Sequence, residues 1–103
     1  MKALVFNPQP AGESALQLAL RYAHEAGMSD NDLYNTYGLH RATLRRISRG
    51  ASTNSSFRYF CHLCLALNDK RLKLANSGHE AEALNLSLKL RDLLLVFAAE
   101  NSK

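Results

Sequence analysis

The chain has 103 residues, which suffices for one compact domain and not for two. Leucine (19) and alanine (14) dominate, whereas isoleucine, valine and threonine together number six, so the composition favours an all-α domain. With 47% hydrophobic and 21% charged residues, the chain is not compositionally disordered. Its longest apolar run, Leu93–Ala99, has seven residues, far short of the roughly 20 that a membrane span needs.

The net charge of +4 is unevenly distributed along the chain. Residues 1–37 and 74–103 carry −2 and −1, whereas residues 38–73 carry +7. A basic segment between two acidic ones indicates a polyanionic partner, with solubility as the alternative explanation. The first residues do not have the form of a signal peptide and there are only two cysteines, so we expect a cytoplasmic protein with reduced thiols.

Residues 1–12 are expected to form an N-terminal arm, because two prolines and a glycine disfavour a helix there. The first helix is predicted over Glu13–Ala26, where apolar residues recur at helical spacing, and Gly27 ends it. A second helix is predicted over Asp30–Tyr37, with Ser29 as its N-cap.

Gly38 is expected to end the second helix in the left-handed conformation that glycine adopts without strain. Only two residues then precede a third helix, predicted over Arg41–Arg49. At 100° per residue this helix has an apolar back of Thr43, Leu44 and Ile47. Its front holds four arginines around one alanine and no acidic residue: Arg41, Ala42, Arg45, Arg46 and Arg49.

Arginine has the planar fork that fits phosphate and the guanine edge, so this front favours nucleic acid over a merely solvated helix face. A helix, a tight glycine turn and an arginine-fronted helix follow the order of a helix-turn-helix unit. In such a unit the second helix enters the major groove of DNA while the first supports it.

A polar loop over Ser52–Ser56 is expected to lead into a fourth helix at about Phe57–Leu67. Its predicted core stripe contains both cysteines, together with the apolar residues Phe57, Phe60, Leu63 and Leu67. The Cys61-x-x-Cys64 pair lacks the second pair of ligands that zinc needs, so we expect buried free thiols and no metal. Asn68–Asn76 is interpreted as a basic connector.

The last helix is predicted from Ser77-Gly78-His79-Glu80, which has the form of a capping box, to about Glu100. Alternating leucines over Leu84–Leu90 are typical of a strand, but the cap, the length and the lack of β-branched residues favour a helix. This helix has two apolar stripes. One stripe suffices to pack on the domain, so the second, with Leu84, Leu88 and Leu95, predicts a homodimer interface; the alternative is a helix wedged within one domain.

Residues Gly27–Leu67 resemble the lambda-repressor-like, Cro-type helix-turn-helix domains of bacterial and phage regulators. The resemblance rests on the following residues in their order and spacing: Gly27-Met28-Ser29, Asp32-Leu33, Tyr37-Gly38-Leu39, Arg41-Ala42-Thr43-Leu44, Ile47 and Arg49-Gly50. With the first helix it covers about half the chain. Asp30 stands where such domains often have glutamine, and Ala23 and Ser48 stand where many members pair an arginine with a glutamate.

The resemblance implies which residues would meet DNA. The start of the third helix and its front would face base edges: His40, Arg41, Ala42, Arg45 and Arg46. The resemblance also places the start of the second helix and the loop after Gly50 near phosphates. The expected backbone contacts are Ser29, Arg49 at the end of the third helix, Ser52, and Arg58, which lies near the start of the fourth helix, where a phosphate contact is natural. His40 is also a candidate cap for the third helix. The implied organisation is an arm (1–12), a helix-turn-helix domain (13–68), and a connector with a C-terminal packing and dimerisation helix (69–103).

We therefore expect a sequence-specific, DNA-binding transcriptional regulator that acts by occupying its site, as a homodimer reading two half-sites about 34–36 Å apart. The alternative is a protein-interaction module, such as an antitoxin-like partner, in which the last helix carries the function. No catalytic constellation, cofactor motif, metal-ligand set or small-molecule site is evident, so an enzyme is not expected.

Overall fold

The computed structural model describes residues 13–50 and 56–101, and within these ranges the protein is all-helical. Five helices follow one another, which confirms the predicted all-α class: α1 (Ala15–Glu25), α2 (Asp30–Tyr37), α3 (Arg41–Ser48), α4 (Ser56–Asn76) and α5 (Glu80–Glu100). The predicted arm over residues 1–12 and the predicted loop contact at Ser52 lie outside the described residues.

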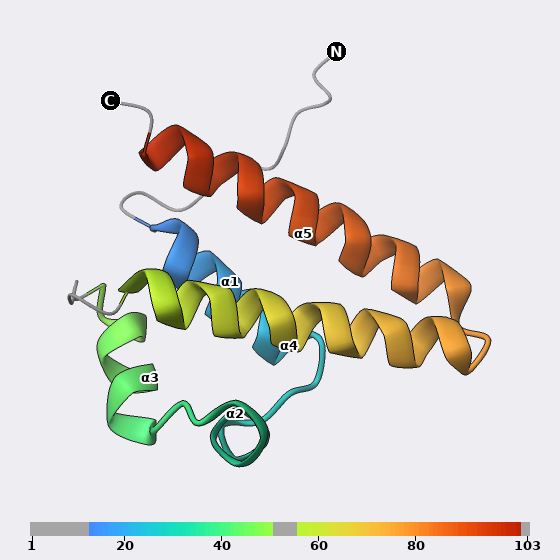
Figure 1. The fold of residues 1–103 in the computed structure, drawn as a ribbon, viewed down its shortest axis with the longest axis horizontal. Helices are drawn as coiled ribbons and strands as arrows, with labels where there is room; N and C mark the ends of the chain where they lie inside the picture. Colours follow the sequence, from blue (N-terminus) through green and yellow to red (C-terminus); the bar gives the residue numbers. More distant parts are fainter. Residues whose placement is uncertain (1–12, 51–55, 102–103) are drawn as a thin grey trace.

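The two long helices, α4 and α5, form an antiparallel hairpin that packs on α1 (Figure 1). α2 and α3 lie on the opposite side of α4 from α5 (Figure 1), and α5 touches neither of them in the part of the chain described. α3 packs on α1, while α2 packs on α3 and α4. The outward surfaces of α3 and α5 are therefore separate regions of the molecule.

Leucines from α2, α4, α5 and the α2–α3 turn form the centre of the core, and five of them are almost completely buried: Leu33, Leu39, Leu63, Leu67 and Leu93. From α1 the core receives three alanines, Ala15, Ala19 and Ala23, all fully buried. Small side chains on α1 allow neighbouring helices to approach its backbone closely, which explains how three helices pack on this short element.

Local signals in the sequence determine where α2 begins and ends. The Ser29 hydroxyl accepts from the backbone N–H of Asp32 at 3.1 Å, and the Asp32 carboxylate accepts from the Ser29 N–H at 2.9 Å. This reciprocal capping confirms Ser29 as the N-cap. At the other end Gly38 has φ +72° and ψ +21°, the left-handed conformation expected of it.

α2 is tied to α4 by one side-chain hydrogen bond. The Tyr37 hydroxyl donates to the Asp69 carboxylate at 2.5 Å across 32 residues of sequence. Burial of the ring and then this hydrogen bond raise the pKa of Tyr37 to about 12, so the hydroxyl remains a donor throughout the neutral range. The contact holds the end of α2, and hence the turn to α3, against the long helix.

α4 is longer than the sequence pattern indicated. The segment Asn68–Asn76, interpreted as a connector, continues the helix to Asn76. The predicted capping box at Ser77–Glu80 is also wrong, because the Ser77 hydroxyl donates to the Lys73 carbonyl at 2.7 Å and so belongs to the end of α4. Gly78, at φ +84°, makes the turn, and α5 begins after His79 without a side-chain cap. The alternating leucines are helical, as predicted.

The inward face of α4 also differs from the predicted stripe. Phe60, Leu63, Ala66 and Leu67 are buried, whereas Phe57 is 64% exposed and Cys61 is exposed. Phe57 lies at the rim of the core, where its ring is 5.7 Å from that of Phe97.

The expectation of two buried thiols is wrong for Cys61, and Cys64 is only half-buried. Burial raises the pKa of the Cys64 thiol to about 11, which keeps it in the unreactive thiol form at neutral pH. Within residues 13–50 and 56–101, no group of three or more histidine, cysteine, aspartate or glutamate side chains is placed to hold a metal ion.

None of the helices in the described ranges combines the length and the apolar character that crossing a membrane requires.

Candidate nucleic-acid interface

α3 has one buried and one exposed side, as its sequence pattern predicts. Thr43, Leu44 and Ile47 are buried against the domain. The opposite side is open to solvent, and we call it the arginine face: Arg41, Ala42, Arg45, Arg46 and Arg49. Arg49 is the C-cap of the helix, so the face spans its entire length.

Among the residues that the structure describes, the arginines of this face have almost no polar partners. Arg41 donates to the Asn31 side-chain oxygen at 3.3 Å, a neutral contact from α2. Arg45, Arg46 and Arg49 make no hydrogen bond or ion pair with any residue in the described ranges. The four positive charges lie within nine residues, Arg41 to Arg49, and repel one another. A bound anion would reduce this repulsion.

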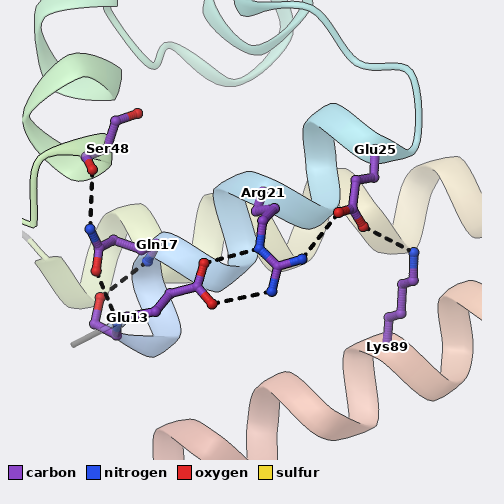
Figure 2. Close-up of polar contacts among 7 residues, drawn as sticks. Glu13, Gln17, Arg21, Glu25, Ser48 and Lys89 are labelled. Carbon is purple, nitrogen blue, oxygen red and sulfur yellow. Dashed lines mark hydrogen bonds and ion pairs between the residues drawn. The ribbon is translucent and has the colours of Figure 1, made fainter. Parts of the chain in front are cut away.

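Acidic side chains near the end of α3 are occupied elsewhere. Arg21 on α1 pairs with Glu13 at 3.0 Å and with Glu25 at 3.1 Å, and Glu25 also accepts from Lys89 of α5 at 3.3 Å (Figure 2). The hydrogen bond from Arg21 to Glu13 is the main cause that raises the pKa of the guanidinium. The Lys89–Glu25 pair links α1 to α5, and none of these three ion pairs involves an arginine of the arginine face.

α3 is held to α1 by Gln17, which the sequence analysis did not single out. Its amide nitrogen donates to the Ser48 carbonyl at 3.1 Å, and its amide oxygen accepts from the Ser14 N–H at 2.9 Å (Figure 2). Gly50 lies beside this amide at φ +85°, where an added Cβ would approach the Gln17 nitrogen to 3.2 Å. The Gln17 contact thus satisfies a terminal carbonyl of α3 and fixes the end of the helix.

Ser48 is one of the two positions at which many of the domains that the sequence resembles pair an arginine with a glutamate. Here its backbone carbonyl, rather than a charged side chain, makes the link to α1. Ala23, the other compared position, is fully buried. For Gln17, the sequence contained one indication of a structural role, the Ser14-x-x-Gln17 capping pattern. This pattern identifies Gln17 as a cap residue of α1, but it does not predict the second contact of Gln17, with Ser48, 31 residues away.

The start of α2 carries negative charge. Asp30 pairs with His24 at 2.8 Å, and Asp32 caps the helix. The pKa of Asp32 is lowered, chiefly by the hydrogen bond from the Ser29 N–H. Because the Ser29 N–H is engaged within the cap, the predicted phosphate contact at Ser29 depends on its hydroxyl as donor, and it stays a prediction.

His40 immediately precedes α3, and two roles were predicted for it: a contact to DNA and a cap of this helix. It occupies the N-cap position, but its side chain makes no capping hydrogen bond. Instead its ring lies 5.0 Å from the ring of Tyr34, which is 47% exposed. This exposed aromatic pair borders the start of the arginine face, and it joins α2 to the α2–α3 turn.

The structure brings the arginine face together on α3, with His40 at its N-cap, and places Ser29, Arg58 and the three leucines of the predicted dimer interface on other helices or at their starts. Arg58 is exposed in the first turn of α4, and Ser29 is exposed at the start of α2. The three leucines predicted to form a dimer interface are on α5 and are exposed by 61% (Leu84), 51% (Leu88) and 49% (Leu95).

In comparisons with known proteins, no protein-family model, curated protein or solved structure matches this chain. Its function is therefore inferred from the arginine face and the elements that hold it.

Proposed function

We propose that this protein is a sequence-specific DNA-binding transcriptional regulator that acts by occupying a site on double-stranded DNA. The observation that carries this proposal is the arginine face: an exposed row of four arginines on a helix whose back is buried in the core. An α-helix fits the major groove of B-DNA, and arginine can donate two parallel hydrogen bonds to guanine there.

The connection between α2 and α3 supports the same function. Three residues join the helices, Gly38 provides the left-handed turn, and Leu39 is buried beneath it. A short turn with a buried leucine orients two helices rigidly, as DNA recognition by a helix-turn-helix unit requires. We propose that the pair is a lambda-repressor-like unit in which α3 reads base edges and Ser29, Arg49, Ser52 and Arg58 meet the DNA backbone.

A protein-interaction module remains the second candidate, and the exposed leucines of α5 favour it. In that case α5 would bind the partner, and the arginine face would contact acidic side chains. The two candidates differ in how affinity for duplex DNA depends on the arginine face. A DNA-binding protein should lose that affinity when the arginines are replaced, whereas a protein-interaction module should not.

Arg58→Gln tests the backbone contact proposed at the start of α4. Phosphate contacts release condensed counterions, so log affinity falls with log salt concentration by about 0.9 per contact. We expect the variant to weaken binding to preferred and random duplexes alike and to lower this slope by about one, measured by fluorescence anisotropy across a salt series.

Lys89→Gln is the matched control for Arg58→Gln. It also removes one positive charge, but from α5, which does not touch α2 or α3 in the described residues. The control should keep the slope of the unmodified protein. Equal slopes for Arg58→Gln and the unmodified protein would remove Arg58 from the interface.

A further inference from the structure

A hollow of about 220 Å³ lies between α2, α4 and the turn that joins α1 to α2, and we call it the α2–α4 hollow. None of the residues that line it belongs to the arginine face. Drug-sized ligands occupy cavities of about 300–1,000 Å³, so this one suits a smaller molecule. Its lining includes two carboxylates, two ammonium groups and two apolar side chains: Asp32, Asp69, Lys70, Lys73, Met28 and Ala66.

The four charged groups of the hollow are not paired with one another. Lys70 and Lys73 make no hydrogen bond or ion pair anywhere in residues 13–50 and 56–101. Asp32 and Asp69 each use Oδ2 to accept one hydrogen bond within the domain, whereas the Oδ1 atoms accept none from the described residues. Two ammonium groups and two carboxylate oxygens are therefore available to a bound molecule.

The signs of these charges determine which ligand the hollow suits. Two aspartates and two lysines give it no net formal charge, so a simple anion or a simple cation is attracted by one pair and repelled by the other. A small molecule that carries both charges is attracted by both pairs. The pKa of Asp32 indicates that the opposite charges interact: it is lowered chiefly by the hydrogen bond from the Ser29 N–H, and Lys70 and Lys73 lower it further.

We propose that the α2–α4 hollow binds a free α-amino acid with a small aliphatic side chain. The ammonium group of the ligand donates to the two carboxylates, and its carboxylate accepts from the two lysines. Hydrogen bonds between charged groups are stronger than those between neutral ones, so this pairing supplies both affinity and orientation. The aliphatic side chain lies toward Met28 and Ala66, the apolar part of the lining.

The site lies where α2 is held against α4. The hydrogen bond from Tyr37 to Asp69 already joins these two helices, and a bound amino acid adds a second link between them. α2 is the helix that we propose supports α3 on DNA, so the ligand is placed to stabilise that arrangement. The inference does not rest on the proposed function, because binding of the amino acid is measured without DNA.

Titration of the full-length protein with L-alanine, L-valine and L-leucine tests the proposal. We expect at least one of them to shift the NMR signals of the Met28, Thr36 and Ala66 backbone amides saturably, with a dissociation constant of about 1 mM or tighter. Acetate and ethylammonium each carry only one of the two charges, and each should bind at least about tenfold more weakly. The absence of a saturable shift with all three amino acids, or an equal response to acetate, would overturn the proposal.

The Lys70→Gln/Lys73→Gln variant tests whether the lysines hold the ligand carboxylate. The two aspartates then remain in the hollow and repel that carboxylate, so the response should disappear at concentrations that saturate the unmodified protein. Lys89→Gln/Arg91→Gln is the matched control, because it also removes two positive charges but from α5, which does not line the hollow, and it should bind normally. Unchanged binding by the double lysine variant, folded as judged by circular dichroism, would contradict the site.

Discussion

Replacing Arg41 or Arg46 by alanine is expected to weaken binding to the preferred duplex about 5- to 150-fold, with a much smaller loss on random duplex. Both arginines are exposed on the arginine face, where we propose that they contact base edges. A bidentate arginine–guanine contact contributes about 1–3 kcal/mol of discrimination, whereas a phosphate contact carries no sequence information. The ratio of the two affinities should therefore fall in these variants and stay unchanged in Arg58→Gln.

The comparison of preferred and random duplexes separates three explanations. A selective loss supports base reading by α3. An equal loss on both duplexes would show that the arginines act only as an electrostatic patch, and the sequence-reading role would be wrong. Unchanged DNA binding in both variants would favour the protein-interaction module instead. Lys89→Gln again serves as the control for the loss of one charge.

Leu63→Ala is expected to lower the free energy of unfolding by about 2–5 kcal/mol, because the side chain is completely buried and its removal leaves a cavity. Leu65→Ala removes the same atoms from a side chain that is 50% exposed, two residues along α4, and should change the stability by less than about 0.5 kcal/mol. Urea denaturation of both variants measures the difference as a shift of the midpoint with an unchanged slope.

Similar midpoints for the two variants would contradict the orientation of α4, which places Leu63 in the core and Leu65 at the surface. α4 contacts α1, α2 and α5, so its orientation determines how the α2–α3 pair is held. It also separates Leu63, in the core, from Cys61, which the sequence pattern placed there and the structure exposes.

Features encoded within a few residues were predictable from the sequence. Ser29 and Gly38 act through local hydrogen bonds and backbone conformation, and both were identified correctly. The two sides of α3 were also predicted, because a helix with arginines on one side and Leu44 and Ile47 on the other has only one favourable orientation.

Features that depend on distant partners were not predictable in the same way. The buried face of α4 depends on its contacts with α1, α2 and α5, so a stripe derived from the sequence of α4 alone misplaced Phe57 and Cys61. Ser77 matched a capping pattern for α5, yet its hydroxyl bonds the end of α4 instead. Asn68–Asn76 is rich in lysine, arginine, leucine and alanine, all good helix formers, and its charges led us to interpret a helix as a connector.

The candidate interface shows the same division. The arginine face follows from the helical repeat of α3 alone. Its attachment to α1 through Gln17, and the pairing of Tyr34 with His40, arise only when separate helices are brought together. The pairing of Arg21 with Glu13 and Glu25 is local, because Glu25 lies one turn further along α1 and Glu13 just before the helix, yet the sequence analysis did not identify it.

Selection of bound sequences from a random pool of duplex DNA at physiological salt tests the central claim most directly. If α3 reads base edges in two copies of the protein, the selected sequences should converge on a palindrome whose half-sites are centred about 34–36 Å apart, one turn of B-DNA. A protein with the Arg41→Ala/Arg46→Ala substitutions should fail to enrich it. A bound pool with no enriched sequence, at a protein concentration that retains DNA, would contradict sequence-specific recognition by this protein.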